Sequence, residues 1–456
     1  MIYVLLLSLA FLISTVFAQA ESSISTSIPT SIATLIETSI STSNPTSVAT
    51  LIETSISTSI PTSIPTLIST STSTSTSISD STSTSYPVPS YLTPFIPTTP
   101  KYNQGNFKNS YKVKQVLDYG RLTDWNNPWE VYRDGGGSCS FGNRTFWLFC
   151  DTLAYTKAGK FAGGASNSLA VARDFSHAGW LKDATIGNGV GYFPAIPFTS
   201  EEIGYMHSVT QRYALWTYTN CIPMSETTAA HFFLVFKFDT AYSSVEYGNT
   251  LALYSLDEDT NEITVSRPSQ YWFPNSTYAY GSFANVVVNG VAYMYALDVQ
   301  YSGKYDVHLA SVPVGRVGQK EHYRYYDAGN KTWSYEQPVP TERRQSAAAI
   351  QGTEPFSSGT VYYSEYHNAY LLIFFNNWVD STFRIISAPT PVGPWNITNS
   401  VLFRSEPGPN GYNYGGLATP VYYEESGKVA GQSVMLSYSY QDVNGTYPRA
   451  LKLTFA

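Results

Sequence analysis

The run DGGGSCSFGNRTFWLFCD, from Asp134 to Asp151, joins a hairpin to an acidic residue at each end. Its Gly-Asn pair precedes a strand-like stretch, Thr145–Phe149, and is typical of a two-residue turn. With Gly142 and Asn143 as the loop, Asp134 lies directly opposite Asp151. Opposed side chains point to one face with β-carbons about 4.5–5.5 Å apart, and like charges there are destabilising. The run therefore predicts two carboxylates held close together against their own repulsion.

A pair of opposed carboxylates destabilises the folded chain, so its presence here indicates a catalytic role. Two adjacent carboxylates cannot both ionise cheaply, so the pKa of one should be raised. The result is an acid beside a base or nucleophile. The alternative is that both are ordinary turn aspartates, or that a bulge shifts the register. We predict Asp134 and Asp151 as catalytic residues and leave open which of them is the acid.

The same pattern of strand, tight turn and strand recurs along the chain. The hairpins follow small-residue lead-ins roughly 60–80 residues apart. Five such units predict an all-β fold, a five-bladed β-propeller, whose blades are four-stranded sheets around a channel. A two-sheet sandwich with long insertions fits this spacing less well. A fifth unit, around Tyr205–Cys221, fills the widest gap between the lead-ins of the other four, which are Asp134–Gly137, Tyr280–Ser282, Ser357–Gly359 and Tyr414–Gly416.

The inner strands of a propeller begin at one mouth of the channel, so the lead-ins should converge on a pocket. Polar and aromatic residues in or near them are candidates for binding a substrate. Each also has an ordinary structural interpretation, as a loop amide, a solvated acid or a packed ring. The predicted substrate-binding residues are Asn167, Glu202, Tyr280, Glu354 and Tyr414.

Composition excludes several classes of protein. Charged residues make up 13% of the chain and aromatic residues 15%, which argues against coiled coils and helical repeats. The net charge of −7 and the pI of 5.4 argue against nucleic-acid binding. No sequence spacing typical of a metal site occurs, and we expect no cofactor. In the predicted register Cys150 faces Gly135 rather than Cys139, so Cys139 or Cys150 could pair with Cys221 instead.

The chain divides into three parts. Residues 1–20 have the apolar run and small residues of a signal peptide; a membrane anchor is the less favoured alternative. Residues 21–100 are rich in Ser, Thr and Pro, which predicts a disordered, mucin-like linker rather than a β-prone adhesive tract. Residues 101–456 are expected to form the propeller. We therefore expect a secreted monomer, with no membrane insertion, that carries N-glycans at some of its five sequons.

The first hairpin resembles the endo-D-arabinanase family of glycoside hydrolases, five-bladed propellers that were formerly a domain of unknown function. The resemblance covers most of residues 101–456 and implies that Asp134 and Asp151 match the two catalytic carboxylates of the family. Cys150 stands where the family usually has Gly, and Ala418 stands where a His often occurs. The resemblance is carried by Arg133–Thr152, Asn167-Ser168, Ser387–Trp395 and Asn413–Pro420.

These observations predict a glycoside hydrolase that acts on furanose-containing polysaccharide by a paired-aspartate mechanism. The alternative is a non-catalytic, carbohydrate-binding propeller at a cell wall or cell surface. Either way, the expected partner is a polysaccharide. The sugar, the linkage and the choice between endo and exo cleavage stay open.

Overall fold

The structure is a computed structural model of the chain. It describes residues 111–124, 129–141, 144–172, 180–183, 194–208, 210–240, 243–257, 259, 262–299, 305–340, 347–353, 356, 358–376, 381–405, 413–420, 431–442 and 445–456. The predicted signal peptide and linker lie outside these residues, as do the hairpin loop at Gly142-Asn143 and the candidate residue Glu354. No helix in the described part of the chain is long and apolar enough to cross a membrane.

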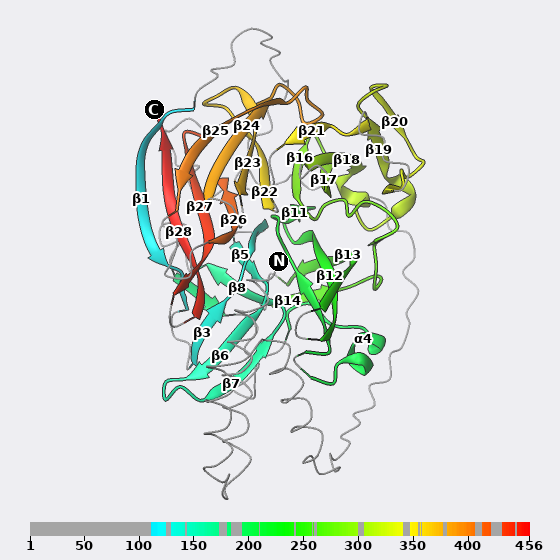
Figure 1. Cartoon of the computed structure of the whole chain (residues 1–456). Helices are drawn as coiled ribbons and strands as arrows, with labels where there is room; N and C mark the ends of the chain where they lie inside the picture. Colours follow the sequence, from blue (N-terminus) through cyan, green and yellow to red (C-terminus); the bar gives the residue numbers. More distant parts are fainter. Residues whose placement is uncertain are drawn as a thin grey trace, which may run out of the picture. The chain divides into compact units, whose positions relative to one another are not determined.

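The described residues form a β-propeller of five blades (Figure 1). In each blade the main strands pair in antiparallel fashion and follow one another in chain order from the inside outward, while the outermost strand of two blades comes from an earlier part of the chain. Blade 1 contains β4 (Gly137–Phe141), β5 (Arg144–Phe149), β8 (Ser168–Ala172) and β9 (Trp180–Asp183), with β2 (Thr123–Asp124) parallel to β9. Blade 2 contains β10 (Arg212–Trp216), β11 (Ile222–Pro223), β12 (Thr228–Thr240), β13 (Ser243–Leu256), β14 (Ile263–Ser266) and β15 (Phe273–Pro274).

The remaining three blades complete the ring. Blade 3 contains β16 (Ala284–Val288), β17 (Val291–Val299), β18 (Tyr305–Pro313), β19 (Arg324–Asp327), β20 (Thr332–Ser334) and β21 (Ile350–Thr353). Blade 4 contains β22 (Ser358–Ser364), β23 (Ala369–Asn376), β24 (Thr382–Ala388) and β25 (Asn396–Arg404). Blade 5 contains β26 (Tyr414–Thr419), β27 (Ser433–Asp442), β28 (Gly445–Phe455) and, from the other end of the chain, β1 (Val113–Arg121).

Three further strands form a sheet outside the blades, and short helices lie between some of the strands. A separate three-stranded sheet consists of β3 (Trp129–Arg133), β6 (Thr152–Thr156) and β7 (Phe161–Ala165). Before blade 2 lies the α-helix α4 (Ser200–Tyr205), and blade 3 carries two 3₁₀ turns, η1 (Val314–Arg316) and η2 (Lys320–His322).

The predicted hairpins and the predicted propeller are confirmed, and the sandwich alternative is wrong. At the turn between β16 and β17, Asn289 and Gly290 have φ values of 50° and 74°, as a two-residue turn with both central residues left-handed requires. The apolar faces of the blades pack against each other in successive layers. One such layer joins blades 4 and 5 through Phe375, Phe383 and Tyr438.

One asparagine, through its side chain and its backbone carbonyl, links the inner strands of the blades. The Asn220 carboxamide oxygen accepts the Ser138 N–H of blade 1 at 2.9 Å. Its Nδ2 donates to Thr360 Oγ1 of blade 4 at 3.1 Å and to the Ala418 carbonyl of blade 5 at 2.8 Å. The Asn220 carbonyl accepts from Asn285 of blade 3 at 3.2 Å. Asn220, which precedes the inner strand β11 of blade 2, thus contacts all four other blades.

A disulfide links blades 1 and 2. Cys139 on β4 is bonded to Cys221, just before β11, with their α-carbons 4.9 Å apart. This is one of the two pairings that the sequence left open. Cys150 is the free cysteine and is buried. Beside the disulfide, the Cys221 N–H donates to the Ser138 carbonyl at 2.9 Å, so covalent and hydrogen bonds join the same two inner strands.

Replacing Cys139 and Cys221 together by Ser should lower the free energy of unfolding by roughly 2–5 kcal/mol. The bridge closes a loop with a sequence separation of 82 residues, and long loops gain most from a crosslink. Denaturant unfolding of the two proteins measures the loss. A reductant should lower the stability of the wild type to that of the variant and leave the variant unchanged. Equal stability of both proteins under oxidising conditions would contradict the prediction.

Candidate active site

Asp134 and Asp151 lie opposite each other, at a break shared by two pairs of strands. On one side of the break Gly137 pairs with Leu148, and on the other Arg133 pairs with Thr152. Between these pairs, the Asp134 N–H donates to the Asp151 carbonyl at 2.8 Å, and the Cys150 N–H donates to the Asp134 carbonyl at 2.8 Å. The register predicted from the Gly-Asn turn is therefore confirmed on both sides of the two aspartates.

A β-carbon on any of the three glycines after Asp134 would collide with a neighbouring strand, which belongs to blade 2 at Gly137 and to blade 1 itself at Gly135 and Gly136. A β-carbon at Gly137 would lie 1.9 Å from the Thr219 carbonyl oxygen of blade 2. Gly135 has a φ of 54°, and a β-carbon there would lie 2.9 Å from Cys150 Sγ. Gly415 of blade 5 packs closely on Gly135: a β-carbon added at Gly415 would lie 3.2 Å from the Gly135 α-carbon. Small residues thus let blades 2 and 5 meet blade 1 beside the aspartates.

Asp151 is ion-paired and fixed in orientation. Its two carboxylate oxygens accept from the Arg212 guanidinium at 3.2 and 2.8 Å, and Oδ1 also accepts from the Trp216 indole N–H at 3.0 Å. The Arg212 guanidinium lies 4.7 Å from the Phe238 ring centroid, on the neighbouring strand β12. A bidentate pair of this kind fixes the plane of the carboxylate. Asp151 therefore presents a positioned, negatively charged group.

Asp134 is the carboxyl group with the raised pKa. Burial, and then the negative charge of Asp151, raise the pKa of Asp134 to about 7. A hydrogen bond from the Tyr414 hydroxyl and the positive charge of Arg212 act in the opposite direction and moderate the rise. One carboxyl group therefore keeps its proton near neutral pH while its neighbour is ion-paired, which is the division of roles that general acid catalysis needs.

Besides Arg212, the groups around Asp134 and Asp151 include the aromatic side chain of Tyr218 and the neutral thiol of Cys150. Tyr218 is half-buried, and its pKa is raised well above the usual value by burial and then by Cys150 and the two aspartates. The Cys150 thiol donates to the Thr217 carbonyl at 3.3 Å, and burial raises its pKa too. Cys150 is thus a neutral packing group under the aspartates, because a reactive cysteine needs a lowered pKa.

Of the four predicted substrate-binding residues that the structure describes, Tyr414 is the one with a hydrogen bond to an aspartate of the pair. It starts β26, is 8% exposed, and donates its hydroxyl hydrogen bond to Asp134. Asn167 is 1% exposed, and its Oδ1 accepts the Ile196 N–H at 2.7 Å, which gives it the structural role of a loop tether. A contact between Asn167 and a sugar stays a prediction.

The prediction for Glu202 is wrong. Glu202 is 0% exposed and ion-paired with Arg267, whose Nη2 donates to Oε1 at 2.8 Å. Its carboxylate also accepts the Thr199 N–H at 2.8 Å, while Thr199 Oγ1 accepts the Glu202 N–H at 3.2 Å. This is a capping box at the start of α4. The carboxylate is therefore used to hold the helix and is closed to a substrate.

The prediction for Tyr280 is also wrong. Its ring is 1% exposed and packs edge-to-face on Phe273, with ring centroids 5.4 Å apart. Tyr278 and Tyr325 surround it in the same apolar cluster. A ring enclosed in this way fills the seam between blades 2 and 3 and cannot stack on a sugar.

Sequence reasoning missed the residues that blade 2 contributes. Arg212 and Trp216 lie on β10 four residues apart, and alternation along a strand puts both on one face. This spacing was visible, but only the fold shows that the face meets Asp151. Glu246 on β13 was missed too; partial desolvation of its carboxyl group raises the pKa to about 7, although the residue is exposed. The charge of Glu246 also raises the pKa of Tyr218, as the charges of the two aspartates do, so Glu246 is a further carboxyl group beside the candidate site.

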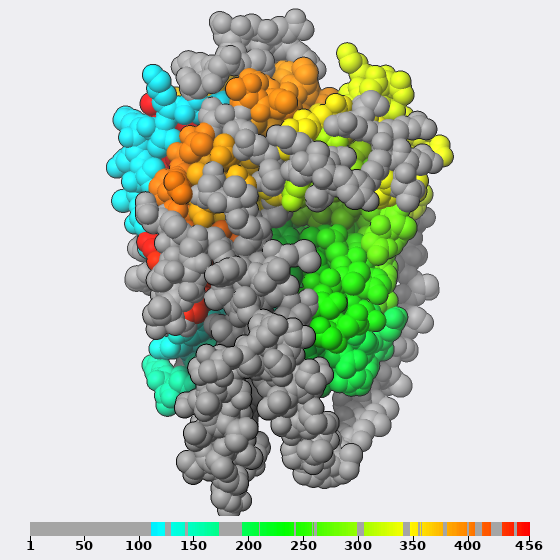
Figure 2. Space-filling model, in the orientation of Figure 1, coloured from blue at the N-terminus to red at the C-terminus, as the bar shows by residue number. Residues whose placement is uncertain are grey.

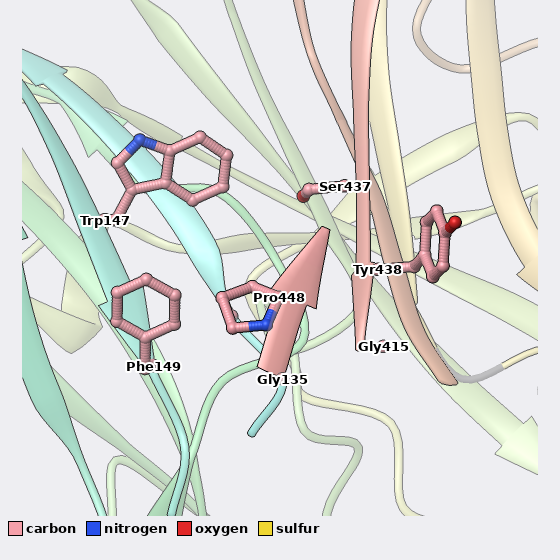
Figure 3. Close-up of a pocket in the computed structure, with 8 residues that line it drawn as sticks. Gly135, Trp147, Phe149, Gly415, Ser437, Tyr438 and Pro448 are labelled. Carbon is pink, nitrogen blue, oxygen red and sulfur yellow. The ribbon is translucent and has the colours of Figure 1, made fainter. Parts of the chain in front are cut away.

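A small hollow lies behind the glycines, at the seam between blades 1 and 5 (Figure 3). The rings of Trp147 and Phe149 line one side, and Ser437, Tyr438 and Pro448 line the other. The hollow is too small for a sugar and belongs to the packing that supports Gly135. Within the described residues no three His, Cys, Asp or Glu side chains form a group that could hold a metal ion.

No protein-family model matches the chain, and no curated protein matches it. Several solved structures do match the chain. A candidate hydrolase of Bacteroides ovatus has a TM-score of 0.54 and 16% identity, and the match covers 78% of this chain and 97% of that one. This likeness shows that the two proteins share a fold.

Two further matches carry glycoside hydrolase names. A family 117 glycoside hydrolase of Zobellia galactanivorans has a TM-score of 0.43 and 10% identity, with coverage of 76% of this chain and 91% of that one. The catalytic domain of a GH62 α-L-arabinofuranosidase of Coprinopsis cinerea has a TM-score of 0.39 and 10% identity, with coverage of 76% and 98%.

Replacing Tyr414 by Phe should raise the pKa of Asp134 above its present value of about 7. The hydroxyl hydrogen bond stabilises the charged form of Asp134, so its loss favours the protonated form. The pKa can be followed by a carboxyl-specific NMR or infrared titration, with Tyr335→Phe, an exposed tyrosine on blade 3, as the matched control. If Asp134 titrates identically in Tyr414→Phe and in the wild type, the hydrogen bond from Tyr414 to Asp134 is contradicted.

Proposed function

We propose that the protein is a secreted glycoside hydrolase that cleaves furanose-containing polysaccharide, as the endo-D-arabinanases that it resembles do. One observation carries the proposal. Asp134, with a pKa of about 7, lies opposite the ion-paired carboxylate of Asp151 at the meeting point of blades 1, 2 and 5. Most glycosidases need two carboxyl groups beside the bond that they cleave, one that carries a proton and one that is ionised.

In the proposed reaction Asp134 donates its proton to the glycosidic oxygen as the bond breaks. Asp151, on the other strand, attacks the anomeric carbon or removes a proton from the attacking water. Arg212 and Trp216 orient the Asp151 carboxylate, and Tyr414 holds that of Asp134. Orientation of this kind matters because reacting groups gain most of their rate advantage from being placed in advance.

The test is incubation of the purified protein with soluble arabinans, galactofuranans and fructans, with product analysis by mass spectrometry. The proposal expects new reducing ends from at least one furanose polymer. Asp118→Asn is a matched control, because Asp118 is an exposed carboxylate on β1 whose ion pair with Arg449 lies on blade 5. Retention of a polymer without cleavage would favour the carbohydrate-binding alternative, and neither binding nor cleavage would reject both.

A further inference from the structure

The sheet of β3, β6 and β7 is built on the same two strand paths as the aspartates. β3 runs directly into Asp134, and β6 begins directly after Asp151. In Figure 1 these three strands extend below β28 and β1, beyond the blades. Arg133 pairs with Thr152 and Glu130 pairs with Tyr155 in one unbroken register. The sheet is therefore a rigid extension of the candidate active site.

One face of this sheet is the face of the aspartates. Side chains alternate along a strand, so Tyr132 is on the side of Asp134, and Leu153 and Tyr155 are on the side of Asp151. Burial follows the same alternation. On that side the residues are half-exposed, whereas Val131 and Ala154, on the other side, are 6% and 0% exposed.

The face shared with the aspartates carries an array of aromatic rings. The Tyr132 and Tyr155 ring centroids are 5.7 Å apart and nearly perpendicular, and Phe161 follows at 5.7 Å from Tyr155. The row continues onto blade 5, because the Arg121 guanidinium lies 5.1 Å from the Tyr132 ring and 4.9 Å from the Tyr447 ring. Part of the chain that forms β6 and β7 is visible as teal atoms at the lower left of Figure 2.

The chemistry of the array suits a sugar chain. Half-exposed rings offer apolar faces for the C–H side of a sugar, and their hydroxyl groups can bond to its polar edge. The exposed Glu130 and Arg121 add an acceptor and donors beside Tyr132. A solvated sheet face has no need of several large rings, and such patches commonly mark binding surfaces.

We infer that this face, formed by Tyr132, Leu153, Tyr155 and Phe161, binds sugar units of the polysaccharide beyond the bond that is cleaved. The inference rests on the proposed function. With a rise of about 3.3 Å per residue, Tyr132 lies roughly 7 Å along the strand from Asp134, and Tyr155 lies roughly 13 Å from Asp151. A chain seated at the aspartates and running along the sheet meets both rings. The occupant is therefore the polysaccharide itself.

The experiment compares Tyr132→Leu with Tyr155→Leu, which keep apolar volume and remove the ring face. Binding to soluble arabinan, galactofuranan and fructan is measured by affinity electrophoresis in an Asp134→Asn background. We expect each change to weaken binding about tenfold for the polymer that binds. Tyr335→Leu, at a tyrosine 64% exposed on blade 3, should leave binding unchanged.

A second readout separates this face from the aspartates. In the active protein, the rate on the polymer relative to that on p-nitrophenyl arabinofuranoside should fall about tenfold in the two Leu variants. If wild type cleaves nothing but binding still depends on Tyr132 and Tyr155, the proposed function fails and the binding face stands. Unchanged polymer binding in both folded variants overturns the inference, as does an equal loss on the polymer and the short substrate. Should either Leu variant unfold, Tyr132→Phe and Tyr155→Phe are measured instead: both keep the ring face and lose only the hydroxyl group, so binding should fall by much less than tenfold, and a tenfold loss would overturn stacking on the rings.

Discussion

Asp134→Asn is expected to lower polysaccharide hydrolysis by about 10²–10⁴-fold. The carboxamide keeps the shape of the side chain and can still accept from Tyr414, but it has no acidic proton for the leaving oxygen. Reducing-end release at saturating substrate measures the loss. Asp118→Asn, which changes an exposed carboxylate on blade 5, should retain full activity.

The same substitution should stabilise the protein as the pH rises. An aspartate whose pKa is about 7 when folded keeps its proton while the unfolded chain loses it, so this group lowers stability progressively from about pH 4 to pH 7. Asn does not titrate. The gain of Asp134→Asn over wild type should therefore be small near pH 4 and reach roughly 1–3 kcal/mol above pH 7, which is less than the full pKa shift would give because Asp134 is partly exposed. A gain in stability that does not change with pH, or a loss of stability that grows as the pH rises, would contradict the raised pKa of Asp134.

Asp151→Asn should cost at least as much activity, because the variant removes the group that attacks carbon or activates water. It also removes the negative charge that raises the pKa of Asp134, so any residual activity should lose its acid at lower pH than the wild type does. Initial rates across pH 4–9 check both effects. Residual activity whose pH dependence matches that of the wild type would show that the two carboxyl groups are not coupled.

Arg212 makes the stability of Asp151→Asn differ from that of Asp134→Asn. The variant leaves the Arg212 guanidinium with a neutral carboxamide in place of its bidentate partner. Loss of one member of a partly buried pair is destabilising. We therefore expect Asp151→Asn to melt below the wild type and Asp134→Asn to melt above it at pH 8.

The paired aspartates could be predicted because their placement is local. A two-residue loop predicted at Gly142-Asn143 sets which residues of the two flanking strands are opposed, and the pairing of β4 with β5 agrees with it, so no distant part of the chain is needed. The same sequence could not reveal Arg212 or Trp216 as partners of Asp151, because that contact depends on how blade 2 packs on blade 1. The choice between Cys139 and Cys150 as partner of Cys221 depended on the same packing.

Two errors have physical reasons. Tyr280 lies shortly before an inner strand and Tyr414 begins one, but a position at the start of a strand does not tell whether a ring faces the pocket or the neighbouring blade. For Glu202 a signal existed in the sequence. Thr199 stands three residues earlier, which is the spacing of a capping box, and this pattern predicts a carboxylate occupied by a helix end.

The most direct test of the account is the pH dependence of kcat/KM on the furanose polymer that wild type cleaves. If Asp134 donates the proton, kcat/KM should fall as the pH rises with an apparent pKa near 7, and this limb should move to higher pH in Tyr414→Phe and to lower pH in Asp151→Asn. Activity that stays constant from pH 6 to 9, or an Asp134→Asn variant with wild-type turnover, would contradict the central role of the two aspartates.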